Sequence, residues 1–536
     1  MDRSAGAADL FSHDGAPVRG SHLSRTLAVL ATIFTLAIGL LITNAEGPYY
    51  GKNRSDPAYA YLFNALDIEQ GIAPFVIHHP GTTVQLIGAA VVRVKWWVEG
   101  QISPQPPIVT SVLLHPEEYL RAINVVLLLL IAATIGVATK RVHELTGQTV
   151  LSLMVPSLLL VSASALGATG QVQPEPLVIP LAMAVTLLAI PRNHQSSAHL
   201  YLRAALFGVA LGTGIITKVT FAPLILLIFV FSSWLAVLIV GISTLITALI
   251  LLLPIVSKLD VSYGWFKALI THQGFYGGGP EGIAPLDRLL SAALDLIGSE
   301  PLIAVGALVA AIGFYCVRLS GAAPADPGWI RFYLATVAVS MAQLLIVAKH
   351  PMPRYLMPGL ASAAIFVPLA LYHINSRISV KVRAFSRVVL LGVAAILFAR
   401  ATYTSVARYL MTQTDKKETV AIQAFAADMD CKLIPYYRAS GLDYALTFGE
   451  YWGGNSFGKQ LAALYPDLVN YNPGSGLFEA FGSMFGDPAA QMGNRQWCLI
   501  GDYDQDSIKF PNAEIKLKKQ IGENLMVVIA PRSPAR

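Results

Sequence analysis

The sequence predicts a polytopic membrane protein built of α-helices, followed by a small α/β domain. Of its 536 residues, 54% are hydrophobic and 13% are charged, which is about half the charged fraction of an average soluble domain. Apolar runs of roughly 20 residues recur along the chain, and each is long enough to cross the hydrocarbon core of a bilayer. Much of the net charge of +6 lies in short loops between these runs, where it sets orientation, so it does not indicate nucleic-acid binding.

The apolar runs predict about eleven membrane-spanning helices. The stretch 82–98 is also apolar, but Arg93 and Lys95 interrupt it, so we expect an interfacial helix there rather than a span. The expected spans are residues 26–44, 119–139, 149–167, 176–191, 204–217, 219–233, 235–256, 296–317, 332–348, 355–373 and 388–403.

Loop charges predict the orientation of these spans. Arg3, Arg19 and Arg25 precede the first span, which favours a cytoplasmic N-terminus because cytoplasmic loops are enriched in Lys and Arg. Alternating from there, the inner loops contain basic residues at 140–141, 192 and 203, 318 and 331, and 377–387. The pattern predicts a multi-pass plasma (inner) membrane protein whose C-terminus is outside. The residues before position 46 could also form a signal-peptidase site, and cleavage after Ala45 would remove only the first span.

Two domains are expected. Residues 1–403 form the transmembrane domain, with a long first outer loop at 45–118, and residues 404–536 form an extracytoplasmic α/β domain. Short β-like runs predict its strands, and the segment GKQLAALYP predicts a helix. In an oxidising compartment Cys431 and Cys498 could pair. The expected strands are YALTF at 444–448, WCLIG at 497–501 and LMVVIA at 525–530.

The predicted outer face combines carboxylates with Lys, Arg and His, whereas the inner loops are mostly cationic. Mixed charge at the ends of spans that face one site suits a phosphorylated, sugar-bearing substrate. The candidate residues are Asp56 and Glu175 as acidic groups, Lys218, Arg354 and Lys349 as phosphate-binding cations, and His79, His272 and Tyr276 as further substrate-binding groups.

Each of these candidates also has a structural explanation. Asp56 precedes Pro57, and Asp-Pro is a common helix start, with the aspartate as N-cap. Glu175 could be an interfacial loop carboxylate. Lys218 and Arg354 could extend from the ends of spans toward water, and the histidines could be hydrogen-bonded within their loops.

The order of several motifs resembles the GT-C superfamily of integral-membrane glycosyltransferases, in particular the protein O-mannosyltransferases and the lipid A aminoarabinose transferases. The resemblance covers about residues 1–403. It rests on SDPAYAYLFNAL after the first span, HHPGTTVQLIGA, QPEPLVIPLAMA, GVALGTGIITKVTFAPLIL and KHPMPRYLMPGLASA. The mannosyltransferases have a paired Asp-Glu in the first loop, whereas Pro57 follows Asp56 here.

The resemblance implies transfer of a sugar from a polyprenyl-phosphate donor to an envelope acceptor, which is a lipid, a glycan or a protein, on the outer face of the membrane. Asp56 would be the base that accepts the proton of the acceptor. Lys218 and Arg354, with Lys349 as a weaker candidate, would stabilise the leaving phosphate, and Glu175 would position acceptor or sugar. The sequence does not require a cofactor. A divalent metal could be held by Asp56, Glu175 and a histidine, although their spacing is no metal signature.

Three other classes of protein remain. A transporter or flippase of lipid-linked sugars tends to have internal repeats and ionisable groups near the middle of the bilayer. We find no repeat, and the ionisable groups cluster at the ends of the spans. A non-catalytic scaffold would not explain the long outer loop 45–118. A polymerase or ligase of lipid-linked glycans shares much of the chemistry, and the sequence separates it poorly from a transferase.

Overall fold

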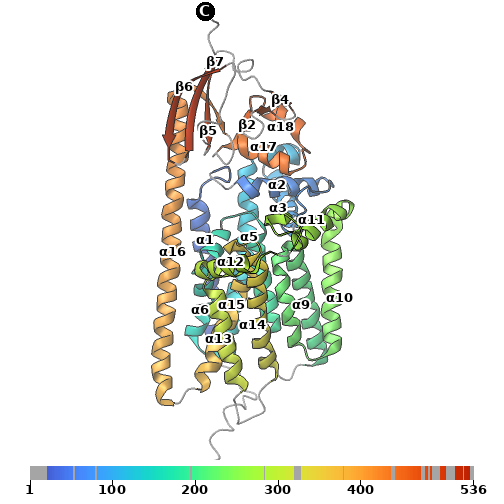
Figure 1. Cartoon of the computed structure of the whole chain (residues 1–536), viewed down its shortest axis with the longest axis vertical. Helices are drawn as coiled ribbons and strands as arrows, with labels where there is room; N and C mark the ends of the chain where they lie inside the picture. The colour runs from blue at the N-terminus through green and yellow to red at the C-terminus, as the bar shows by residue number, and fades with distance from the viewer. Residues whose placement is uncertain are drawn as a thin grey trace, which may run out of the picture.

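A bundle of long helices carries a smaller domain at one end, which we call the domain end (Figure 1). The computed structural model describes residues 21–51, 55–78, 81–192, 196–282, 284–318, 327–377, 380–435, 441–472, 477–480, 483–485, 495–501, 513–522 and 524–531. The bundle contains α1 (Ser21–Ala45), α5 (Pro116–Thr146), α6 (Thr149–Leu160), α7 (Ala163–Ala168), α8 (Pro174–Ala189), α9 (Ser197–Thr217), η2 (Val219–Val230), α10 (Trp234–Leu252), α13 (Leu302–Arg318), α14 (Pro327–Ala348), η5 (Pro353–Leu356), α15 (Met357–Arg377) and α16 (Val380–Asp428).

Several of these helices can cross a membrane. Among the described residues, six helical segments are long and apolar enough to do so, or seven if the bent pair of α12 (Leu286–Ser299) and α13 is one span. The chain is therefore a multi-pass membrane protein. The count of eleven stays a prediction, because α6, α8 and η2 have only 12, 16 and 12 residues. The six segments are His22–Ala45, Pro116–Thr146, Ser197–Thr217, Trp234–Thr271, Pro327–Ala348 and Pro353–Arg377.

Two long connections between the bundle helices form short helices near the domain end (Figure 1). Between α1 and α5 lie α2 (Ser55–Glu69), α3 (Thr82–Gly100) and α4 (Ile108–Leu114). Between α10 and α13 lie η3 (Leu253–Lys258), α11 (Leu259–Thr271), η4 (Phe275–Gly277) and α12 (Leu286–Ser299).

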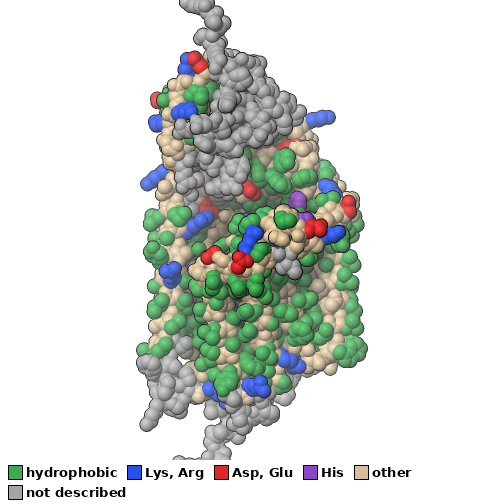
Figure 2. All heavy atoms as spheres, in the orientation of Figure 1, with side chains coloured by type: hydrophobic (Ala, Val, Ile, Leu, Met, Phe, Trp, Pro, Cys, Tyr) green, Lys and Arg blue, Asp and Glu red, His purple; other side chains and the backbone are tan. Residues whose placement is uncertain are grey.

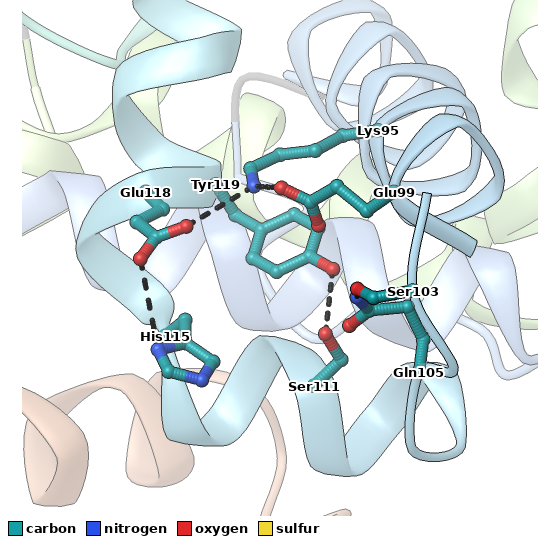
Figure 3. Close-up of polar contacts among 8 residues, drawn as sticks. All are labelled: Lys95, Glu99, Ser103, Gln105, Ser111, His115, Glu118 and Tyr119. Carbon is teal, nitrogen blue, oxygen red and sulfur yellow. Dashed lines mark hydrogen bonds and ion pairs between the residues drawn. The ribbon is translucent and has the colours of Figure 1, made fainter. Parts of the chain in front are cut away.

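The basic residue that interrupts the apolar run of α3 holds this helix against α5. The ammonium of Lys95 contacts Glu99 and lies 3.2 Å from Oε2 of Glu118, and it sits 4.7 Å from the ring centroid of Tyr119 (Figure 3). The phenol of Tyr119 in turn is 2.8 Å from the hydroxyl of Ser111 on α4. These contacts of Lys95 fix α3 beside α5. Helix α3 is not among the described segments that are apolar enough to span a membrane.

Helix α12 meets α13 at an angle of 89°. The expected span 296–317 therefore begins at Leu302, and its first residues belong to α12. Leu286, Leu290 and Leu294 form an exposed stripe along α12, whereas Leu296 is buried. Figure 2 shows charged side chains on α12 and mainly hydrophobic side chains below it, down to a set of Lys and Arg at the lower end of this face.

The described residues of the C-terminal domain form two sheets. Its four-stranded sheet has the order β1-β5-β7-β6, in which β1 is parallel to β5 and the other pairs are antiparallel. The second sheet joins β2, β3 and β4. The elements are β1 (Cys431–Pro435), α17 (Leu442–Trp452), α18 (Gly458–Leu464), β2 (Asn470–Asn472), β3 (Leu477–Ala480), β4 (Ser483–Phe485), β5 (Gln496–Gly501), β6 (Ala513–Ile521) and β7 (Asn524–Pro531).

The expected strands at 497–501 and 525–530 are confirmed as β5 and β7, and the expected helix is confirmed as α18. The expected strand YALTF is wrong, because these residues lie in α17, whose buried face packs on α2. Cys431 and Cys498 form a disulfide. Helix α16 continues through residues 403 and 404, and the strands begin only at Cys431.

Candidate active site

The centre of the candidate site is Glu175, in the first turn of α8. Pro174 is the first residue of this helix, where proline is favoured because its missing N–H would be unpaired there in any case. A carboxylate in this turn also interacts favourably with the positive end of the helix dipole. Glu175 is only 2% exposed, so its charge requires partners within the protein.

Lys218 supplies the first of these partners. It lies between α9 and η2 with an extended backbone (φ −162°, ψ 132°), which ends α9 and turns the side chain away from the helix. Its ammonium contacts Oε1 of Glu175 and lies 4.1 Å from the ring centroid of Tyr355. Lys218 is buried. The pair is therefore a buried ion pair with an aromatic ring against its cation.

Arg354 supplies the second cation from η5. Its Nε lies 3.7 Å from Oε1 of Glu175, and 44% of its side chain is exposed. The guanidinium is 5.5 Å from the ring centroid of Tyr355. One carboxylate and one ring are thus shared by two cations, which leaves a net positive charge. Since Lys218 is buried and Arg354 is not, Arg354 is the cation that a ligand can reach.

A tyrosine from the glycine-containing loop after α11 reaches the same ring. The phenol oxygens of Tyr276 and Tyr355 are 2.7 Å apart. The backbone N–H of Tyr276 donates to Nδ1 of His350 over 3.3 Å, and the two rings stack. Tyr276 has φ 52° and Gly277 has φ 82°. These contacts attach the loop to the cations through Tyr355.

Asp56 lies at the start of α2. Its backbone is extended (φ −94°, ψ 116°), so the regular part of the helix begins at Pro57 and Asp56 has the N-cap position. Its side chain is exposed. One turn further along, the pKa of the Tyr61 phenol is raised well above its ordinary value, first by burial and then by nearby negative charges that include Glu175 and Asp56. The two carboxylates therefore act on the same buried phenol.

Backbone and hydroxyl contacts fix these elements to one another. The N–H of Gly81 donates to the carbonyl of Ile216 over 3.1 Å, and the hydroxyls of Thr83 and Thr217 are 2.8 Å apart, directly before Lys218. Gly81 has φ 68°, and a Cβ there would lie 3.1 Å from the Tyr61 hydroxyl. The start of α3 thus packs between α2 and the end of α9.

Glu117 fixes the segment that leads into α2. Its carboxylate accepts hydrogen bonds from the backbone N–H groups of Tyr49 (2.7 Å) and Tyr50 (3.0 Å). It also accepts one from the hydroxyl of Tyr59 over 2.8 Å. A single carboxylate at the start of α5 therefore holds both the approach to Asp56 and the first turns of α2.

The other expected site residues have different surroundings. The ammonium of Lys349 donates to the carbonyls of Leu269 (2.6 Å) and Ile270 (3.0 Å) at the end of α11, rather than contacting Glu175. Nδ1 of His272 is 3.0 Å from the hydroxyl of Thr271. His79 lies outside the described residues.

A metal was the remaining option for the acidic residues. The described ranges contain no group of three or more His, Cys, Asp or Glu side chains that could hold a metal ion. Glu175, one of the expected ligands, is contacted by two cations instead.

Two residues of this site were missed by the sequence reasoning. Tyr355 holds Lys218, Arg354 and Tyr276 around one ring, and its only signal in the sequence is its position next to Arg354. Tyr61 links the surroundings of Asp56 and Glu175. It is one of two tyrosines in the first turns of α2, Tyr59 and Tyr61, and the sequence does not show which of them faces the site.

Comparison with known proteins supports the fold. No protein-family model matches the sequence, and no curated protein matches it. Among solved structures, the chain is similar to ArnT from Cupriavidus metallidurans in the apo state, with 12% identity, 92% of this chain and 97% of that chain covered, and a TM-score of 0.52. ArnT from the same organism bound to undecaprenyl phosphate has the same identity and coverage, with a TM-score of 0.48.

ArnT is a lipid A aminoarabinose transferase of the GT-C superfamily. The chain therefore shares the fold of ArnT, and the resemblance expected from the sequence is confirmed at the level of the fold. At this identity the similarity concerns the fold alone, so activity and substrates have to be argued from the residues of the site.

Proposed function

We propose that the protein is a membrane glycosyltransferase that moves a sugar from a polyprenyl-phosphate donor to an acceptor of the cell envelope. The observation that carries this proposal is the pair of cations, Lys218 and Arg354, on the single carboxylate of Glu175. Such a site has one net positive charge and one exposed guanidinium, which suits a lipid phosphate.

The reaction would be a displacement at the anomeric carbon of the donor sugar. A hydroxyl or amine of the acceptor attacks this carbon, and the bond between the carbon and the phosphate oxygen breaks. The proton of the acceptor passes to the carboxylate of Asp56, and the polyprenyl phosphate leaves with the bonding electron pair. A single displacement inverts the anomeric centre.

The charge and exposure of each residue indicate which role it would have in this reaction. Asp56 has an exposed carboxylate with which to accept a proton. Arg354 would bind the phosphate directly, and Lys218 would add positive charge from within the protein as negative charge grows on the leaving group. Glu175 would hold both cations in place, which differs from the acceptor-positioning role that the sequence suggested.

The remaining candidates would have supporting roles. Tyr276 would close the site from the loop after α11 through its contact with Tyr355. Lys349 would fix the end of α11 rather than bind phosphate. His79 and His272 are kept as residues that contact the sugar or the acceptor.

We also infer that the domain end faces the outside of the cytoplasmic membrane and that residues 404–536 form an extracytoplasmic domain. The cationic loops of the other end support this orientation. The disulfide between Cys431 and Cys498 supports it as well, since disulfides persist in oxidising compartments. The acceptor is a lipid, a glycan or a protein, and the proposal does not involve nucleic acid.

The experiment is mass spectrometry of envelope glycolipids and glycoproteins from cells with and without the gene, followed by complementation with Arg354→Met. We expect one sugar modification to be lost, to return with the parent gene and to return poorly with the variant. Unchanged envelope sugars, together with impaired movement of lipid-linked sugars across the membrane, would favour a flippase instead.

A further inference from the structure

Helix α17 of the C-terminal domain packs directly on α2, the helix that begins at Asp56. The contact is close because two glycines, Gly449 within α17 and Gly453 directly after its end, face a buried phenylalanine. A Cβ added to Gly449 would lie 2.9 Å from Cδ2 of Phe63, and one added to Gly453 would lie 3.0 Å from its Cβ. Phe63 is 0% exposed. Any larger residue at these glycines must therefore separate the two helices.

A buried asparagine on α2 joins the same two helices by hydrogen bonds. Nδ2 of Asn64 donates to the carbonyl of Trp452, the last residue of α17, over 2.7 Å. Its Oδ1 accepts from the backbone N–H groups of Phe75 (2.6 Å) and Val76 (2.8 Å). Asn64 is 0% exposed. One side chain thus connects α2, α17 and the segment after α2.

The segment 73–78, which we call the strap, contacts α3, η3, α11 and α17. Nε2 of Gln85 donates to the carbonyl of Val76. Lys258 and Ser262, from the η3–α11 region, donate to carbonyls of the strap over 2.9–3.1 Å. The Trp452 ring lies 6.3 Å from the ring of Phe75 and 6.4 Å from that of His78. The strap leads into α3, which reaches Lys218 through Gly81 and Thr83.

We infer that α17 is a positioning element for the transfer reaction: by packing on Phe63 and bonding to Asn64 it fixes the distance between Asp56 and the cations on Glu175. This inference rests on the proposed function, because it assigns Asp56 to the reaction. It gives the C-terminal domain a role that is neither a separate lid nor a separate acceptor-binding module.

The length of α2 explains how the contact acts at Asp56. Phe63 lies seven positions after Asp56, which corresponds to roughly 10 Å of helix at 1.5 Å per residue. A helix of this length moves as a rigid rod, so a shift at Phe63 displaces the N-cap residue as well. A misplacement of about 1 Å can lower a catalytic rate about 100-fold. Lys218 and Arg354 are on other elements, so a shift of α2 changes the distance between Asp56 and these cations.

The test introduces one methyl group between the helices. Gly449→Ala places a Cβ 2.9 Å from Phe63, where carbon atoms prefer about 3.5–4.0 Å, so α2 and α17 must separate. We expect kcat to fall about 10- to 100-fold with KM for the polyprenyl-phosphate sugar nearly unchanged. Adding Phe63→Leu removes the ring that the methyl group meets and should restore most of kcat.

The matched control is Gly264→Ala on α11, where a Cβ would meet nothing within 4 Å, and its kcat should equal that of the parent. Hydrogen exchange of residues 55–62 provides a readout that does not depend on activity. It should become faster in Gly449→Ala and return to the parent rate in the double variant. Parent-like hydrogen exchange of the buried strands β5 and β7 in each variant shows that the domain is still folded.

The outcomes separate this inference from the proposed function. A parent protein without transfer activity refutes the proposed function, while the exchange of residues 55–62 still decides whether α17 fixes α2. Unchanged kcat and unchanged exchange in Gly449→Ala would overturn the inference, as would a loss of kcat that Phe63→Leu does not relieve. Should Gly449→Ala fail to fold, Gly453→Ala is the milder substitution, because its Cβ would lie 3.0 Å from the Cβ of Phe63, and a smaller kcat loss that Phe63→Leu relieves is expected.

Discussion

Replacing Lys218 by methionine should destabilise the protein, whereas replacing Arg354 should not. Lys218 is buried against a carboxylate that is only 3% exposed, so Lys218→Met leaves the charge of Glu175 buried with one distant partner. Removing one member of a buried ion pair typically costs about 3–5 kcal/mol. Arg354 is 44% exposed and 3.7 Å from the same oxygen. Its removal should therefore cost no more than about 1 kcal/mol of stability.

The double variant Glu175→Leu/Lys218→Met isolates the interaction. Replacing a buried pair by apolar residues of similar volume is often neutral or stabilising, so the double variant should recover most of the loss. The assay is the free energy of unfolding in detergent micelles, beside binding of undecaprenyl phosphate. We expect Arg354→Met to be stable but weak in phosphate binding. Parent-like stability of Lys218→Met, or equal destabilisation by Arg354→Met, would refute the reasoning.

Three further predictions use single contacts. Burial is the main cause that raises the pKa of Asp67 from an ordinary value of 3.8 to about 7. Between these two pH values the folded protein keeps a proton on Asp67 that the unfolded chain releases. The free energy of unfolding should therefore fall as the pH rises from about 4 to 7. Asp67→Asn should remove this contribution, which is at most about 1.4 kcal/mol per pH unit, and a parent-like pH slope in the variant would contradict it. Tyr276→Phe deletes the 2.7 Å contact with Tyr355 and should lower kcat/KM up to about tenfold, in line with a hydrogen bond of about 0.5–1.5 kcal/mol; unchanged kcat/KM would remove the loop from the mechanism. Non-reducing mass mapping of protein isolated under alkylating conditions should find Cys431 and Cys498 joined, and two free thiols would be the contrary result.

Much of the site could be predicted because charged residues are rare in this chain. A carboxylate or a cation at the end of an apolar run is conspicuous, and the alternation of spans brings such residues to one end of the bundle. Glu175, Lys218 and Arg354 were expected on one face for this reason, and the structure places both cations on the carboxylate. Which cation is buried depends on the packing of α8, α9 and η5, and the sequence does not contain that information directly.

Aromatic residues and short segments were harder to predict. In the sequence, Tyr61 and Tyr355 cannot be distinguished from tyrosines of a hydrophobic core, because the residue type is the same whether or not its ring contacts a cation. The five residues YALTF include Tyr, Thr and Phe, which are favoured in strands, but a window this short cannot separate strand from helix. Packing on α2 decides for the helix. The contacts of Lys349 with the end of α11 depend on where a distant loop folds.

The most direct test of the whole account is the transfer rate of Asp56→Asn, measured with a polyprenyl-phosphate sugar and the acceptor identified by mass spectrometry. Asn caps a helix about as well as Asp, so the extended N-cap geometry of this residue and the expression of the protein should be kept. An amide cannot accept the proton of the acceptor, and general-base catalysis commonly contributes about 10²–10⁴-fold. The account predicts a loss of that size with binding of undecaprenyl phosphate unchanged. Transfer by Asp56→Asn within a few-fold of the parent would contradict it and leave Asp56 as a helix cap.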